Sequence, residues 1–225
     1  MASQNYQILV DKLMNSGFML HKTLDNISTT DLLIEVTNAT IEWYLSINDL
    51  VLMASDSEQN NLQNDLNLRR MSNGGTILDY KIKYGAPVMN FDFYAIGMYV
   101  EKVRRTIDFS MEFLRENINR FPTTSEVFLL DNSGKLFSKK GELVRNLDPE
   151  ELPFKIIKYL YNKKHVQTEV LLKSIDCANK NVFYKSIENF NKDFKKKTLY
   201  SSNLINGLPR QGYIINPIFS IKLKK

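Results

Sequence analysis

The chain has 225 residues, of which 43% are hydrophobic, and it carries a formal net charge of +5 at pH 7. This composition excludes a disordered chain, and the length suits one large domain or two small ones. The single cysteine excludes an internal disulfide framework, and the polar start from Met1 to Asn5 is unlike a signal peptide. The densest apolar run, residues 43–53, is too short to span a membrane. We therefore expect a cytoplasmic protein with no membrane partner.

Helices are predicted for most of the first 121 residues. Leucines recur on one stripe between residues 5 and 24, and a second helix is expected to begin near Ser28 and to continue through Val51. The polar segment 55–66 is expected to be a loop. Alternating apolar and polar residues over 78–84 predict a short strand, and a long helix is expected over 91–120.

The long helix carries apolar residues at steps of three or four: Val100, Val103, Ile107, Met111, Leu114, Ile118 and Phe121. Such a stripe packs either in the core of a helix bundle or along the seam of a dimer. The pattern itself does not distinguish the two. We predict a homo-oligomer, most simply a homodimer, formed through residues 1–121.

A change of charge accompanies the best domain boundary. From Thr123 onward the chain has 19 Lys and Arg against 10 Asp and Glu, a net charge of +9, whereas the first 122 residues have 11 against 15, a net charge of −4. Pro122 lies at the change and blocks continuation of a helix. We therefore predict a helical domain at 1–121 and a basic domain at 122–225. The basic charge fits either a polyanion-binding surface or a lysine-rich solvated one.

The basic domain reads as a mixture of strands and helices. Short extended segments at 126–130, 135–138 and 143–144 predict a small antiparallel meander. Asp148 and Pro149 are suited to the N-cap and first position of a helix, and two more helices are expected at 167–175 and 179–197. Residues 203–215 read as a hairpin. The predicted fold class is α+β: a mainly α-helical N-terminal domain followed by a domain with a β-meander, three helices and a C-terminal hairpin.

The third of these helices has two chemically different faces. Phe183, Ile187, Phe190 and Phe194 form an apolar face. The opposite face holds hydrogen-bond donors suited to bases and phosphates: Asn181, Lys185, Asn189, Lys192 and Lys196. A merely solvated face usually mixes charges of both signs, whereas only Glu188 and Asp193 flank this one. The segregation favours contact with nucleic acid over plain solvation.

Several segments of the basic domain resemble the OmpR/PhoB-type winged-helix domains of response regulators. In that family a strand meander precedes a helix opened by Leu-Thr-Pro-x-Glu, and this chain has Leu-Asp-Pro-Glu-Glu at 147–151. The basic end of the family's recognition helix is matched by residues 192–197, and its closing hairpin pattern in part by Ile205 and Gly212-Tyr213. The resemblance covers about residues 125–216. It implies a winged helix-turn-helix that binds double-stranded DNA.

The sequence departs from the family in three places. Arg210 stands where the family usually has the first glycine of the wing, and Pro153 is unusual in the first helix. Residues 1–121 do not resemble a receiver domain, since they lack its alternation of strands and helices and its phosphoacceptor site. Control by aspartyl phosphorylation is therefore not implied.

Residues that could support catalysis are scattered. His21 and His165 lie in different halves of the chain, and neither is near a cluster of acids or cysteines with ligand spacing. We expect no enzyme activity, no metal and no cofactor.

The predicted function is sequence-specific binding of double-stranded DNA by a transcriptional regulator that acts as a dimer. The alternatives are a replication, partition or mobile-element factor, and an assembly protein whose winged helix contacts protein. The predicted DNA-binding residues are Asn179, Lys180, Asn181, Lys185, Asn189, Lys192, Lys195, Lys196, Arg210 and Gln211.

Overall fold

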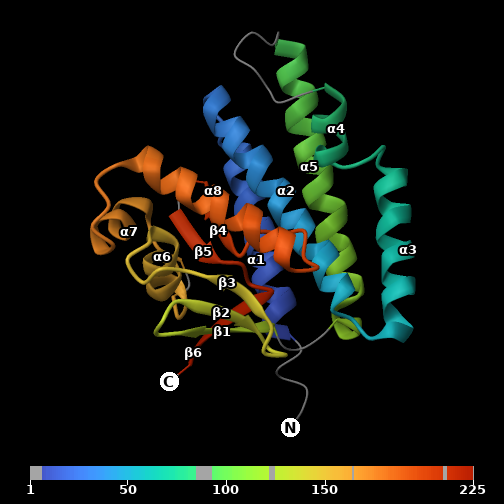
Figure 1. The fold of residues 1–225 in the computed structure, drawn as a ribbon. Helices are drawn as coiled ribbons and strands as arrows, with labels where there is room; N and C mark the ends of the chain where they lie inside the picture. Colours follow the sequence, from blue (N-terminus) through green and yellow to red (C-terminus); the bar gives the residue numbers. More distant parts are fainter. Residues whose placement is uncertain (1–6, 85–92, 122–124, 164, 210–211, 225) are drawn as a thin grey trace. The chain divides into compact units, whose positions relative to one another are not determined.

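The computed structural model describes residues 7–84, 93–121, 125–163, 165–209 and 212–224 (Figure 1). The chain divides into two compact units, Met1–Thr124 and Ser125–Lys225. The first is helical in its described part and the second combines helices with strands, so the predicted α+β class with a mainly helical N-terminal part is confirmed. No helix in the described ranges has both the length and the apolar character needed to cross a membrane.

The N-terminal unit is a bundle of helices arranged around α5. Its elements are α1 (Gln7–Asp25), α2 (Thr30–Leu52), α3 (Asp56–Ser72), α4 (Ile77–Tyr84), α5 (Phe93–Glu116) and a short 3-10 turn, η1 (Ile118–Arg120). Helix α5 contacts all four other α-helices of the unit, and Figure 1 shows it between α2 and α3. Its apolar stripe faces these neighbours, with Val103, Ile107 and Leu114 fully buried. The stripe is therefore used within the bundle, which removes the sequence argument for a dimer seam.

Two elements of the N-terminal unit differ from the sequence prediction. The segment 55–66, predicted as a loop, is helical from Asp56 onward and forms the first part of α3. This helix buries only Leu62 and Leu66, while its other two large apolar residues, Leu68 and Met71, are exposed. The segment 78–84, predicted as a strand, belongs to α4. Its helix is favoured by a reciprocal cap, in which Asp79 Oδ2 accepts from Thr76 N at 2.7 Å and Asp79 N donates to Thr76 Oγ1 at 3.3 Å. The apolar alternation did not mark a sheet face, because Ile82 is exposed.

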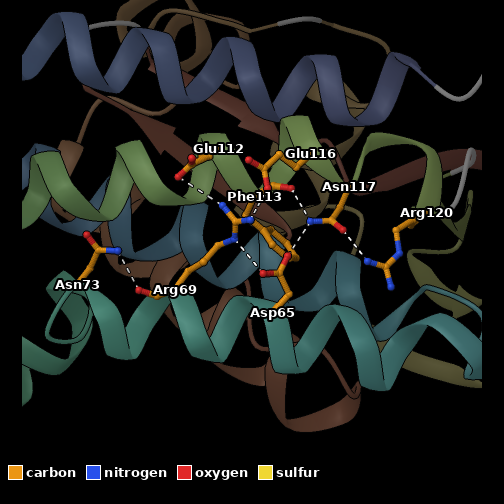
Figure 2. Close-up of polar contacts among 8 residues, drawn as sticks. All are labelled: Asp65, Arg69, Asn73, Glu112, Phe113, Glu116, Asn117 and Arg120. Carbon is orange, nitrogen blue, oxygen red and sulfur yellow. Dashed lines mark hydrogen bonds and ion pairs between the residues drawn. The ribbon is translucent and has the colours of Figure 1, made fainter.

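A network of hydrogen bonds and ion pairs joins α3 to α5 (Figure 2). It supplements the few apolar contacts that α3 makes with the bundle. Arg69 of α3 pairs with Asp65 at 3.0 Å, with Glu112 at 3.3 Å and with Glu116. Asn117, which is buried, donates to Asp65 Oδ2 at 2.9 Å and accepts from the Arg120 guanidinium at 2.7 Å. The acid-rich face of α5 thus holds a helix that has only two buried leucines.

The C-terminal unit contains two sheets and three α-helices. Strands β1 (Glu126–Asp131), β2 (Lys135–Ser138) and β3 (Leu143–Asn146) form the predicted antiparallel meander, and β6 (Phe219–Lys224) joins it parallel to β1, giving the order β3-β2-β1-β6. Between β3 and β6 come α6 (Leu152–Leu160), α7 (Thr168–Ser174), α8 (Lys180–Lys197) and the hairpin of β4 (Ile205–Leu208) and β5 (Gly212–Ile215). Val166, between α6 and α7, forms an isolated antiparallel bridge with Tyr213 of β5.

Helix α6 begins later than its sequence signals indicated. Glu151 is its N-cap and Pro153 lies in its first turn, where a proline is tolerated because the first amides have no partner within the helix. Asp148 instead forms a preceding turn, in which its Oδ1 accepts from Glu150 N at 2.9 Å. The prediction of Asp148 as N-cap and Pro149 as first helical residue was wrong, because a second proline four residues later competes for the same role.

Candidate nucleic-acid interface

Aromatic residues hold α8 against the strands of the C-terminal unit. Phe194 makes edge-to-face contacts with Phe128 of β1 at 5.2 Å and Phe219 of β6 at 5.4 Å between ring centroids. At the other end of the helix Phe183 contacts Tyr213 of β5 at 5.2 Å. Both phenylalanines are buried. The predicted apolar face of this helix is confirmed, and it fixes which face points away from the unit.

A buried asparagine fixes the register of α8 against the hairpin. Asn191 Nδ2 donates to Ile205 O at 2.9 Å, and Asn191 Oδ1 accepts from Ile205 N at 3.1 Å. Asn191 therefore pairs with the first residue of β4 as a neighbouring strand would, and both polar groups of the backbone are satisfied. Helix and hairpin are held as one piece.

The opposite face of α8 is exposed as predicted. It presents three lysines and two asparagines within about 80° at 100° per residue: Asn181, Lys185, Asn189, Lys192 and Lys196. Across the described part of the chain, no hydrogen bond or ion pair engages these five side chains. Their ammonium and amide groups are available to an anionic partner.

Three of the predicted DNA-binding residues have other contacts. Asn179 is the N-cap of α8, with Oδ1 accepting from Asn181 N at 2.9 Å and from Val182 N at 3.2 Å, so its side chain serves the helix. Lys180 pairs with Glu169 of α7 at 2.5 Å, and this hydrogen bond raises the pKa of Lys180. Lys195 is half-buried and also interacts with another group of the protein. Arg210 and Gln211 lie outside the described residues.

Two acids lie beside the lysines of α8, and they differ in their surroundings. Asp193 pairs with Arg145 of β3, so an arginine neutralises its charge. Glu188 is exposed and lies next to Lys192 and Lys185 on the helix surface, four and three positions away. The face is therefore predominantly but not purely cationic.

Apolar side chains on the same helix were not predicted as part of the face. Val182 and Tyr184 are 51% and 45% exposed at the N-terminal end of α8. Val182 lies three residues before Lys185 and seven before Asn189, so all three fall on one stripe. That spacing is visible in the sequence and could have identified Val182 as a candidate contact.

Polar side chains elsewhere in the described part of the chain stabilise the fold. No group of three or more His, Cys, Asp or Glu side chains among the residues that the structure describes could hold a metal ion. Lys102 donates to the carbonyl oxygens of Asn73, Gly74 and Gly75 at 2.9, 3.0 and 3.3 Å and so closes the α3–α4 turn.

No protein family model, curated protein or solved structure matches this chain.

Proposed function

We propose that the C-terminal unit binds double-stranded DNA through the exposed face of α8 and that the protein is a cytoplasmic transcriptional regulator. The observation that carries this proposal is the separation of the two faces of α8. One face is anchored by buried aromatic rings, and the other presents Lys185, Lys192 and Lys196 with no partner in the described part of the chain. Lysines suit phosphate oxygens and guanine edges, and asparagines suit adenine edges.

The order of elements supports a winged helix as the form of this module. The chain runs from α6 through Val166 to α7, α8 and the β4–β5 hairpin, and Val166 pairs with Tyr213 of the hairpin. A winged helix sets one helix in the major groove and lays a hairpin beside it. In this proposal α8 is the recognition helix and the β4–β5 hairpin is the wing. Arg210 and Gln211, which lie between β4 and β5 in the sequence and outside the described residues, are proposed to contact the DNA backbone or the minor groove.

The N-terminal unit is proposed to pair two copies of the protein. A dimer raises the affinity of weak modules, because the second one binds at a high effective concentration. Since the α5 stripe is buried inside the bundle, a dimer would use other surfaces, such as the exposed Leu68 and Met71 of α3. Light scattering on the full chain at micromolar concentration tests this, and a monomeric mass would refute it.

Loss of charge from the face of α8 tests the DNA proposal. The variant Lys185→Ala/Lys192→Ala should weaken duplex binding at least tenfold and lower the salt slope by about two, the signature of two lost phosphate contacts. The matched control is Lys139→Ala/Lys140→Ala, which removes the same charge from the exposed β2–β3 turn. Equal binding by the two double variants would show that net charge, and not this face, is responsible.

Sequencing of the fragments retained from genomic DNA at near-physiological salt addresses the role. Fragments upstream of genes support a transcriptional regulator. Fragments from replication origins or element ends support the replication, partition or mobile-element alternative, which would use the same interface. A protein that retains no duplex at all fits the assembly alternative, in which the module contacts protein.

A further inference from the structure

Val182 is an exposed apolar residue within a face of amides and ammonium groups. It lies in the first turn of α8, where Asn179 Oδ1 accepts from its backbone N–H, so its position on the helix is fixed. Its side chain is 51% exposed, although valine gains from burial. An isopropyl group forms no hydrogen bond with phosphate, but at this position it is accessible to an apolar group of a bound duplex.

The neighbours of Val182 on the helix are suited to one kind of base pair. Asn181 is adjacent in sequence, and Asn189 lies two turns further along the same stripe as Val182, within about 20° at 100° per residue. Both asparagines are exposed. A carboxamide can donate to adenine N7 while accepting from adenine N6, and an aliphatic side chain can pack on the thymine methyl group. These two contacts belong to the same base pair, and G·C offers neither of them in the major groove.

We infer that α8 reads A·T base pairs in the major groove, with Val182 on a thymine methyl group and Asn181 or Asn189 on adenine. The inference rests on the proposed function, since it names the class of duplex that the same face recognises. Lys185, between Val182 and Asn189 on the stripe, supplies the electrostatic attraction to the backbone. Specificity for A·T pairs then comes from the apolar and amide groups, and affinity comes mainly from the lysines.

Three synthetic duplexes of about 20 base pairs, two turns of B-DNA, separate these contributions. The first is alternating dA·dT, the second has dU in place of every dT, and the third is alternating dG·dC. Replacing dT by dU removes the methyl group from the major groove and leaves the minor groove unchanged, so it isolates readout by Val182. The full-length protein should bind the dT duplex most tightly and lose about fourfold on the dU duplex for each methyl contacted, the equivalent of one buried methylene group.

The variant Val182→Ala should lose most of the difference in affinity between the dT and dU duplexes, because its shorter side chain makes less contact with the methyl group, while its thermal unfolding stays as in the wild type because the side chain is exposed. Val170→Ala is the matched control: Val170 is 47% exposed on α7 and should retain the discrimination between dT and dU. Asn181→Ala/Asn189→Ala should reduce the preference for dA·dT over dG·dC.

The possible outcomes test the readout of A·T pairs separately from DNA binding itself. Binding of all three duplexes with no difference between dT and dU would overturn the readout of thymine by Val182 and leave DNA binding intact. A preference for dA·dT over dG·dC that survives in the dU duplex, in Val182→Ala and in Asn181→Ala/Asn189→Ala would also overturn it and would indicate readout of the minor groove. Failure to bind any duplex would refute the proposed function itself.

Discussion

Val166 and Tyr213 exchange two backbone hydrogen bonds, each 2.8 Å long from nitrogen to oxygen. They join the segment between α6 and α7 to the second strand of the hairpin, which lies after α8 in the chain. Since Phe183 of α8 packs on the Tyr213 ring, the hairpin and α8 are positioned by the same residue. The position of α8 relative to the hairpin, on which the proposed DNA interface depends, is therefore fixed by contacts of Tyr213 with Val166 before α7 and with Phe183 of α8.

Gly212 is required at this junction. Its φ is +104°, and a Cβ there would lie 2.0 Å from the carbonyl oxygen of Val166. Gly212→Ala should lower the free energy of unfolding by about 2 to 4 kcal/mol, from backbone strain together with overpacking. The control is Gly141→Ala, where φ is +85° but no atom lies within 4 Å of the added Cβ, so only the strain of about 1 to 2 kcal/mol remains. Denaturant unfolding measures both, and equal losses would show that the close approach to Val166 is unimportant.

Asn191 should be the most sensitive polar position of α8. Asn191→Ala removes two hydrogen bonds and leaves the N–H and C=O of Ile205 without their partner, at a cost of about 2 to 4 kcal/mol. Asn189→Ala makes the same change on the exposed face, where the expected effect is within about 0.5 kcal/mol. Chemical denaturation of the two variants checks this, and a loss of under 1 kcal/mol for Asn191→Ala would contradict the anchoring role.

The helices of the C-terminal unit were largely predictable because their apolar faces repeat clearly. The phenylalanines of α8 gave both the helix and its inward face. The start of α6 was missed because Pro149 and Pro153 both suit a first turn, and only packing decides between them. Asn179 caps α8 and Lys180 pairs with Glu169. Both interactions depend on side-chain rotamers and on neighbours in space, which the sequence pattern does not show.

The N-terminal unit was harder to predict. Helix α3 buries two leucines and is otherwise held by Arg69 and its acids, so its apolar period is too short to recognise. Helix α4 shows chance alternation, although the Thr76-x-x-Asp79 spacing is a capping signal that could have indicated a helix. The α5 stripe was identified correctly, but sequence alone cannot say whether its partners belong to the same chain.

The cap of α4 should make the N-terminal unit sensitive to acid. Burial of Asp79 opposes its ionisation, but hydrogen bonds from Arg70 and Thr76 outweigh burial and hold the pKa of Asp79 below its usual range. Stability from ionised Asp79 is therefore fully present above about pH 3.9, the usual value for an unfolded chain, and is lost as the pH falls through the lower folded pKa.

Asp79→Asn should accordingly be less stable than the wild type at pH 7, and the difference should shrink as the pH falls below about 4. Thermal unfolding of both proteins across this range measures it. Asp11→Asn removes the same charge from an exposed position of α1 and serves as the control. A difference between Asp79→Asn and wild type that stays constant with pH would contradict the role of the ionised carboxylate.

Glu188 should weaken DNA binding in the wild type. It is exposed among the lysines of α8, where its charge repels phosphate, so Glu188→Gln should tighten binding to any duplex by about two- to fivefold at low salt. The gain should fade at high salt because the interaction is screened. Fluorescence anisotropy at two salt concentrations checks this. Weaker binding by Glu188→Gln would mean instead that the carboxylate accepts a hydrogen bond from a base.

The most direct test of the account is the salt dependence of duplex binding by the full-length protein. The logarithm of the association constant should fall linearly with the logarithm of salt concentration, with a slope of about −3 or steeper, because Lys185, Lys192 and Lys196 each displace counterions from phosphate. Binding should be stronger to the duplex than to either of its single strands. Absence of binding at low salt, or a slope near zero, would contradict the claim that α8 is a DNA-binding helix.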